Sequence, residues 1–298
     1  GLALPTEDKC GYGAWTRATG GTADAQGTTN DLSSGLETPS DLSATYYGLQ
    51  VGGDFGCFQG HYSGWDLAFG GIAGLNSGTT TQPVFALNAA TGVFSNVQIS
   101  ETTADFDQQY AGAYITASKE RWTMDLQIRA EQTDFTLNNV GLNGRAGLGL
   151  TDVPFDVKGT TLSGAVSYSI PLKADGWNVV PTIGFSLTKS KTSDVVFANT
   201  STLEIDDHTS QILFLGSTIS KVKVAEDGNS ARNYFATGTY YADLSDELTS
   251  TFTDRAGVPT VNPLTSSTIG DYAEISVGMN YIRVFQKSDT GRALRQFV

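Results

Sequence analysis

The chain has 298 residues, of which 16% are charged and 39% are hydrophobic, and its net charge is −13. This acidic balance excludes the basic footprint that nucleic-acid binding requires. No apolar run approaches the roughly 18 residues of a transmembrane helix, so apolar side chains must be placed one at a time along the chain.

Apolar and polar residues alternate along many segments, which is the pattern of a β-strand with two different faces. In the segment 122–131, one parity is apolar from Trp122 to Ile128, whereas the other carries Asp125, Arg129 and Glu131. Ten full strands are predicted, and an eleventh begins at Arg292. In chain order, the ten are 11–27, 45–60, 64–80, 106–119, 121–136, 159–172, 176–193, 205–226, 230–246 and 270–287. Pro181 falls inside one of them and predicts a bulge or a broken pairing, because proline donates no ladder hydrogen bond.

The connections between these strands alternate between short and long. A soluble β-sandwich has no reason to alternate in this way, whereas an outer-membrane barrel has short periplasmic turns and long extracellular loops. The sequence therefore predicts an all-β, antiparallel transmembrane barrel. The expected short turns are 61–63, 119–121, 173–176, 227–229 and 288–291, and the expected long loops are 28–44, 83–104, 138–158, 193–207 and 247–268.

Aromatic residues stand just after the chain start or after each short turn, at intervals of 53 to 57 residues. Amphipathic rings suit the headgroup level of a membrane, so these residues are expected to form a periplasmic girdle. Chance placement of core aromatics in a soluble β protein would not explain why they follow the short turns. The five girdle residues are Tyr12, Trp65, Trp122, Trp177 and Tyr234.

Strand parity assigns the remaining side chains to lipid or to the lumen. The expected lipid-facing residues are Trp65, Leu67, Phe69, Trp122, Met124, Leu126, Ile128, Trp177 and Ile183. Charged residues of the opposite parity would line the pore or grip a linker, or would form a hydrated salt-bridge network that stiffens the barrel. The sequence supports both interpretations of these charged residues. The expected pore-lining residues are Arg17, Asp54, Asp66, Asp125, Gln127, Arg129, Glu131 and Glu274.

Residues with catalytic or metal-binding chemistry are few. His61 and His208 are the two histidines, and neither stands among further ligands at metal-site spacing. Four acidic residues of one loop region suggest a weak calcium site, but their spacing does not match an EF-hand, so a solvated acidic loop is the better interpretation. The loop residues are Asp243, Asp246, Glu247 and Asp254. No enzyme activity, cofactor or metal is predicted.

Cys10 and Cys57 are the two cysteines, and a disulfide between them is predicted. An outer-membrane protein folds from an oxidising periplasm, where paired cysteines persist. Antiparallel pairing of the first two strands brings both residues to the periplasmic end on one outward face. The alternative is a pair of free, lipid-facing thiols.

Several segments resemble the autotransporter β-domain, especially its alphaproteobacterial versions. They are Gly11–Ala18, Tyr47–Asp54, Gly64–Gly71 and Gly270–Gly278. The resemblance extends over nearly the whole chain. It implies a 12-stranded barrel with a helix or linker in its pore, joined to an N-terminal passenger. Residues 1–9 would then be a linker stub and 10–298 the barrel, which is expected to lack its C-terminal end and to continue by about one and a half strands.

The resemblance implies a translocator that assists export and surface display of a passenger by type V secretion. A stand-alone porin or small-solute channel is the alternative. A soluble secreted adhesin is disfavoured because a β-solenoid repeats every 20–30 residues, not every 55. The expected location is the outer membrane of a Gram-negative bacterium. The expected partners are outer-membrane lipid, lipopolysaccharide, the barrel assembly machinery and the protein's own passenger, with no nucleic acid.

Overall fold

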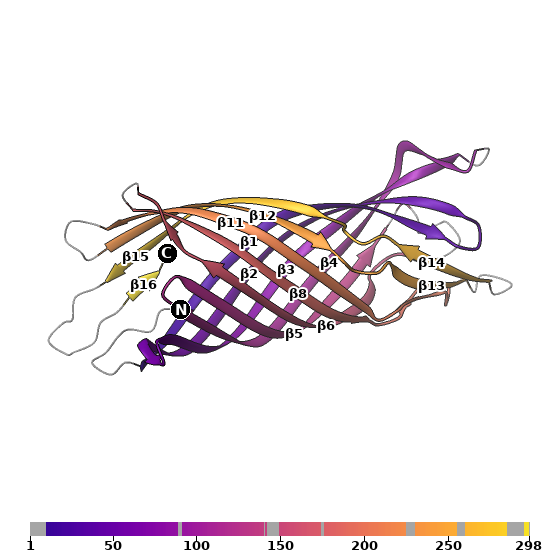
Figure 1. The fold of residues 1–298 in the computed structure, drawn as a ribbon. Coiled ribbons are helices and arrows are strands. Elements are labelled where there is room, and N and C mark those ends of the chain that lie inside the picture. The colour runs from indigo at the N-terminus through magenta and orange to yellow at the C-terminus, as the bar shows by residue number, and fades with distance from the viewer. Residues whose placement is uncertain are drawn as a thin grey trace.

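The computed structural model describes residues 10–88, 91–139, 141, 149–173, 176–224, 230–254, 260–284 and 295–297, without the side chains of 58–61, 224, 230–231, 280–284 and 295–297. These residues form one antiparallel, strongly curled sheet (Figure 1). No helix in this part of the chain is long and apolar enough to cross a bilayer.

Ten long strands correspond one to one with the ten expected strands. They are β1 (Cys10–Asp31), β2 (Leu36–Tyr62), β3 (Trp65–Asn88), β4 (Val93–Lys119), β5 (Trp122–Asn138), β6 (Val153–Tyr168), β8 (Trp177–Thr192), β11 (His208–Val224), β12 (Ser230–Asp243) and β15 (Tyr272–Val284). Each pairs with its neighbours in chain order, as expected for an up-and-down barrel. The expected eleventh strand corresponds to β16 (Arg295–Phe297), which pairs with the end of β15.

The prediction of long loops at 28–44 and 83–104 was wrong. β1 and β2 remain paired as far as Asp31 and Leu36, and β3 and β4 as far as Asn88 and Val93. In these strand ends apolar and polar side chains do not separate onto opposite faces, so apolar alternation could not reveal them. Next to these strand ends, hydroxyl-to-carboxylate hydrogen bonds join outward side chains of paired strands, from Ser43 Oγ to Asp24 Oδ1 at 2.6 Å and from Thr79 Oγ1 to Asp105 Oδ1 at 2.6 Å.

The tip between β1 and β2 is held by Asp31. Its carboxylate accepts hydrogen bonds from the hydroxyl and the backbone N–H of Ser33 and from the hydroxyl of Ser34. The hydroxyl of Ser33 is the largest cause that lowers the pKa of Asp31 to about 2. Gly35 follows at a φ of 69°, a left-handed conformation that glycine adopts without a Cβ penalty.

Pro181 interrupts the ladder on one side only. β6 pairs with β8 as far as Thr182, and the short strand β7 (Ile170–Pro171) resumes the pairing at Val179. On the other side, Pro181 lies opposite Ser217 in an unbroken register with β11. The expected broken pairing is therefore present, and it is limited to the β6 side.

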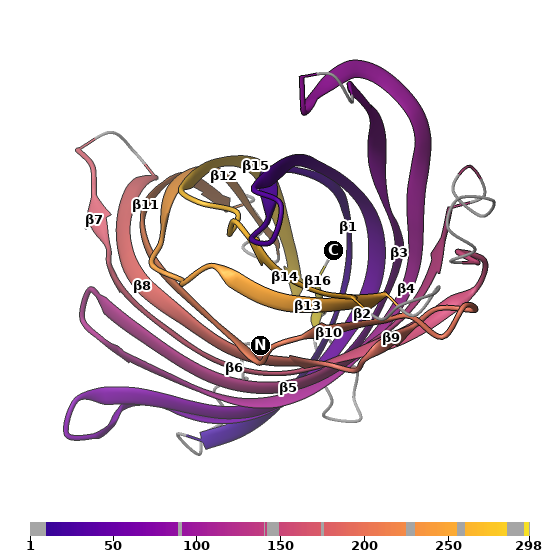
Figure 2. The same cartoon turned by 90° about the vertical axis from the view of Figure 1, so that its right-hand side faces the viewer.

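Four shorter strands from the last two long connections form a strap at the end of the sheet that carries the long loops. They are β9 (Val195–Val196), β10 (Thr202–Ile205), β13 (Leu248–Asp254) and β14 (Thr260–Ser266). β14 pairs with Thr29–Asp31 of β1, and the order continues through β13 and β10 to β9. Seen from this end, β13 and β10 lie across the curve of the sheet (Figure 2).

Candidate functional site

The two faces of the sheet differ in polarity. Residues that lie opposite one another on neighbouring strands form rows across the sheet, and successive rows belong to opposite faces. One row of cross-strand partners is apolar over seven strands. Its members, from β2 to β11, are Phe55, Phe69, Ile115, Leu126, Gly164, Phe185 and Leu213. The adjacent row, one residue away, is mostly polar and begins at β1. Its members are Gly13, Asp54, Gly70, Tyr114, Gln127, Ser163, Ser186 and Ile212.

Contacts between strands that are not neighbours identify the polar row as the concave face, because curvature brings only inward side chains together. Trp15 on β1 donates from Nε1 to the Tyr114 hydroxyl on β4 at 3.2 Å. That hydroxyl donates in turn to Asp54 on β2 at 2.8 Å, and Asp54 is 6% exposed. The polar row therefore faces the lumen, and the apolar row faces outward.

All eight expected pore-lining residues have the parity of this inward face, and several have partners there. Arg129 and Glu131 form an ion pair at 2.8 Å, and Asp125 accepts a hydrogen bond from Thr116 at 2.7 Å. Glu274 accepts from the Tyr241 hydroxyl at 3.3 Å. Arg17, Asp66 and Gln127 lie opposite Gln50, Ser118 and Tyr114 in the register. These groups are distributed over the wall, so they do not form a single reactive centre.

Sequence reasoning missed a column of inward aromatic rings on β4. Phe106, Tyr110 and Tyr114 lie over three glycines of β3, and a Cβ on any of these glycines would overlap the ring opposite it. The glycines are Gly70, Gly74 and Gly78. The signal was present in the sequence as two series, one of glycines and one of aromatics, each spaced by four residues on adjacent strands. The Tyr110 ring also faces the Arg129 guanidinium, 5.1 Å away.

Replacing Tyr114 with phenylalanine should destabilise the folded domain by about 1.5 kcal/mol, because Asp54 loses a charge-assisted hydrogen bond. The free energy of unfolding, measured by denaturant titration in detergent, tests this. Tyr110→Phe is the matched control, since the ring of Tyr110 makes the described contact and remains in the variant. An equal loss in both variants would contradict the assigned role of the Tyr114 hydroxyl.

The five expected girdle residues have outward parity and lie at the end of the sheet with the short turns. Tyr12 packs on Phe55 with ring centroids 5.0 Å apart, and Trp122 packs on Tyr168 at 4.7 Å. Lys119 and Lys221 lie over the rings of Trp65 and Trp177 at 5.7 and 5.2 Å. Phe55, Tyr168 and the two lysines were missed because the sequence pattern considered only residues that follow a turn.

Cys10 and Cys57 are direct partners in the β1–β2 register and are joined by a disulfide. Both cysteines have the expected outward parity, that of Tyr12 and Phe55, and Cys57 is only 3% exposed. β1 has β2 along its whole length on one side, but on the other side its described partner is β14, at Thr29–Asp31 only. The disulfide therefore links the start of this edge strand to its main neighbour.

The described residues contain no group of three or more side chains that could hold a metal ion. Asp243 accepts hydrogen bonds from Ser245 and from the backbone of Gly270, whereas Asp254 accepts from Ser201. The two carboxylates therefore accept hydrogen bonds from different loops and do not share a site. The side chain of His61 lies outside the described residues.

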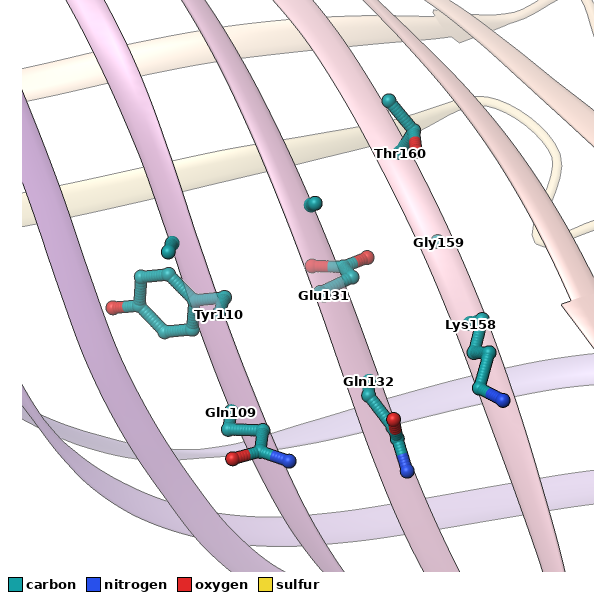
Figure 3. A pocket seen from close by; sticks show the side chains of 9 residues that line it. Gln109, Tyr110, Glu131, Gln132, Lys158, Gly159 and Thr160 are labelled. Carbon is teal, nitrogen blue, oxygen red and sulfur yellow. The ribbon is translucent and has the colours of Figure 1, made fainter.

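A hollow of about 520 Å³ lies on β4, β5 and β6 (Figure 3). Six of its nine lining residues have outward parity, and the other three lie between them along the strands. The hollow is therefore on the outward face. The outward residues are Gln109, Ala111, Ala130, Gln132, Lys158 and Thr160.

Two comparisons with known proteins, one with family models and one with solved structures, agree with this geometry. The chain matches the family described as autotransporter beta-domain over residues 14–283. The β domain of the Bordetella autotransporter BrkA has 15% identity and a TM-score of 0.57, with 90% of this chain and 95% of that chain covered. The transport unit of the Escherichia coli autotransporter AIDA-I has 13% identity and a TM-score of 0.64, with coverages of 95% and 88%. No curated protein matches the chain.

Proposed function

Because the chain belongs to the autotransporter β-domain family, we propose roles in passenger export for its lumen wall, its edge strand β1 and its outer surface. The domain is an outer-membrane translocator of a Gram-negative bacterium that assists export and surface display of an N-terminal passenger. The observation that carries this function is the family match over residues 14–283. This match favours a translocator over the alternative of a stand-alone porin.

The inward residues line the path of the exported chain and hold the linker that follows it. Their composition supports this role, because hydroxyls, amides and a few ion pairs bind a passing polypeptide weakly through exchangeable hydrogen bonds. The network of Trp15, Tyr114 and Asp54 stiffens the wall across four strands. In this proposal the wall provides a hydrated, rigid passage and performs no chemical reaction.

Residues 1–9, which lie outside the described residues, would be the linker stub that leads from the passenger to the barrel at Cys10. The edge of β1 before Thr29 would be closed by a further strand, since closure removes the exposed main-chain groups of a sheet edge. The closed form that we propose is a 12-stranded barrel that includes residues 10–298.

The outward surface would meet outer-membrane lipid and lipopolysaccharide, and the barrel assembly machinery would insert the domain. The apolar row from Phe55 to Leu213 and the aromatic girdle support the lipid contact. The domain would carry no enzyme activity and no cofactor of its own, so any catalysis would belong to the passenger.

Surface display tests the function. A reporter inserted in place of the passenger in the full-length protein should become accessible to antibody and protease on intact cells. The matched control carries the same reporter on a domain with Leu126→Arg, which should not assemble. A reporter that stays in the periplasm although the wild-type barrel has assembled would contradict the translocator function.

A further inference from the structure

Three lysines gather on the outward face of β6 and β8, at the extracellular edge of the apolar band. Lys158 and Lys191 are direct cross-strand partners, and Lys189 lies opposite Thr160, the next outward residue of β6. The side chains of Lys158 and Lys189 are 66% and 70% exposed. Like charges directly opposite each other destabilise a sheet, so an anion bound between these lysines would stabilise the arrangement.

The height of the lysines above the girdle places them at the lipid headgroups. Ten residue steps separate Lys158 from Tyr168 on β6, which packs on the girdle residue Trp122, and twelve separate Lys189 from Trp177 on β8. At about 3.3 Å per residue and a tilt of about 40°, ten steps rise about 25 Å, which is the height of a lipid-facing band. Below them the outward face is apolar, with Leu162 opposite Leu187.

The charge of these three lysines, called the lysine patch below, is opposite to that of the surrounding outward surface. In the described strands above the apolar band, acidic side chains dominate the outward face, and Lys158, Lys189 and Lys191 are its basic residues. Their described ion pairs are long, at 3.7 Å from Lys158 to Asp156 and 3.9 Å from Lys189 to Asp207. Ammonium groups held this loosely can turn toward a stronger anion.

The outward hollow adjoins the patch at Lys158. Its outward lining includes the hydrogen-bonding groups of Gln109, Gln132 and Thr160 and the small side chains of Ala111 and Ala130. Figure 3 shows Gln109, Gln132 and Lys158 at successive strands around this hollow. Amides and a hydroxyl beside three ammonium groups suit a phosphorylated sugar.

From this register we infer that Lys158, Lys189 and Lys191 bind the phosphates of lipid A in the outer leaflet, with the sugar headgroup seated in the hollow. Lipid A is the phosphorylated glycolipid anchor of lipopolysaccharide, which forms that leaflet. The inference rests on the translocator being an outer-membrane barrel, and it deepens the proposed lipid contact by naming the lipid and the residues. Docking at β6 and β8 would fix the depth and rotation of the barrel in the membrane.

The test measures binding of bisphosphorylated lipid A to the full-length protein, purified in detergent, with dephosphorylated lipid A as the second probe. The triple variant K158Q/K189Q/K191Q should lose about 100-fold in affinity, since each basic residue near an anionic membrane surface contributes about fivefold. The matched control K173Q/K221Q/K223Q removes the same charge at the opposite, periplasmic end and should stay near the wild-type affinity.

Wild-type protein should bind the dephosphorylated lipid as weakly as the triple variant binds the phosphorylated one. Equal binding of both lipids by the wild type would overturn the inference, even if the triple variant failed to fold. An unchanged affinity in a folded triple variant would also overturn it, as would an equal loss in the control. Surface display of the passenger by the triple variant reads out the translocator function separately.

Discussion

Leu126→Arg is expected to prevent stable assembly of the domain, at a cost of about 2–4 kcal/mol for a charge on the lipid face near the membrane midplane. Leu126 lies in the apolar outward row between Ile115 and Gly164, and its side chain contributes to the exposed surface. Gln127→Arg is the matched control, because Gln127 is the next residue on the same strand and belongs to the polar inward row.

The measurement is the folded fraction after insertion into lipid vesicles, read from the heat-modifiable mobility of the protein on a gel. The control should fold nearly as well as the wild type, since water and polar groups solvate an arginine in the lumen. Equal impairment by both substitutions, or greater impairment by Gln127→Arg, would mean that the two faces of β5 are assigned the wrong way round.

Removing the Cys10–Cys57 disulfide should lower the free energy of unfolding by about 2–4 kcal/mol, the usual contribution of such a link. The two cysteines are 47 residues apart in sequence, so the bond restricts a long loop of the unfolded chain. It also holds the start of β1 against β2 at the edge of the sheet, where β1 has β2 as its described partner.

Denaturant unfolding of the variant C10A/C57A, followed by tryptophan fluorescence, measures this loss. Wild-type protein in a strong thiol reductant is the control and should match the double variant, because each lacks only the bond. Quantitative thiol labelling of the unreduced native protein would refute the link. So would a reductant that leaves the unfolding midpoint unchanged.

The ten long strands and their faces were predictable because the membrane imposes a simple rule on the sequence. Within the bilayer, one parity must be apolar, and β5 follows this rule over every residue from Trp122 to Glu131. Outside the bilayer, neither face of a strand has to be apolar. The extensions of β1 to β4, in which the two parities do not differ in this way, were therefore taken for loops, although they remain paired.

The strap and the inward aromatics depend on contacts that alternation does not encode. β14 pairs with β1 across more than 200 residues of sequence, and two separate connections must fold together before β10 can pair with β13. The inward column from Phe106 to Tyr114 needs glycines on the neighbouring strand, so it becomes visible only when the register of β3 and β4 is known. The lysine patch likewise depends on the β6–β8 register.

The central claim is that the outward face meets lipid, with its girdle at one membrane boundary, whereas the inward face meets the lumen. Quenching of single-tryptophan β domains by brominated lipids in vesicles tests this most directly. A domain that retains only Trp122 should be quenched strongly, and more by bromines near the headgroup than by bromines near the chain ends. A domain that retains only Trp15 should be almost unaffected, since its indole bonds to Tyr114 on the inward face. Equal quenching of the two tryptophans, or stronger quenching of Trp15, would contradict the account.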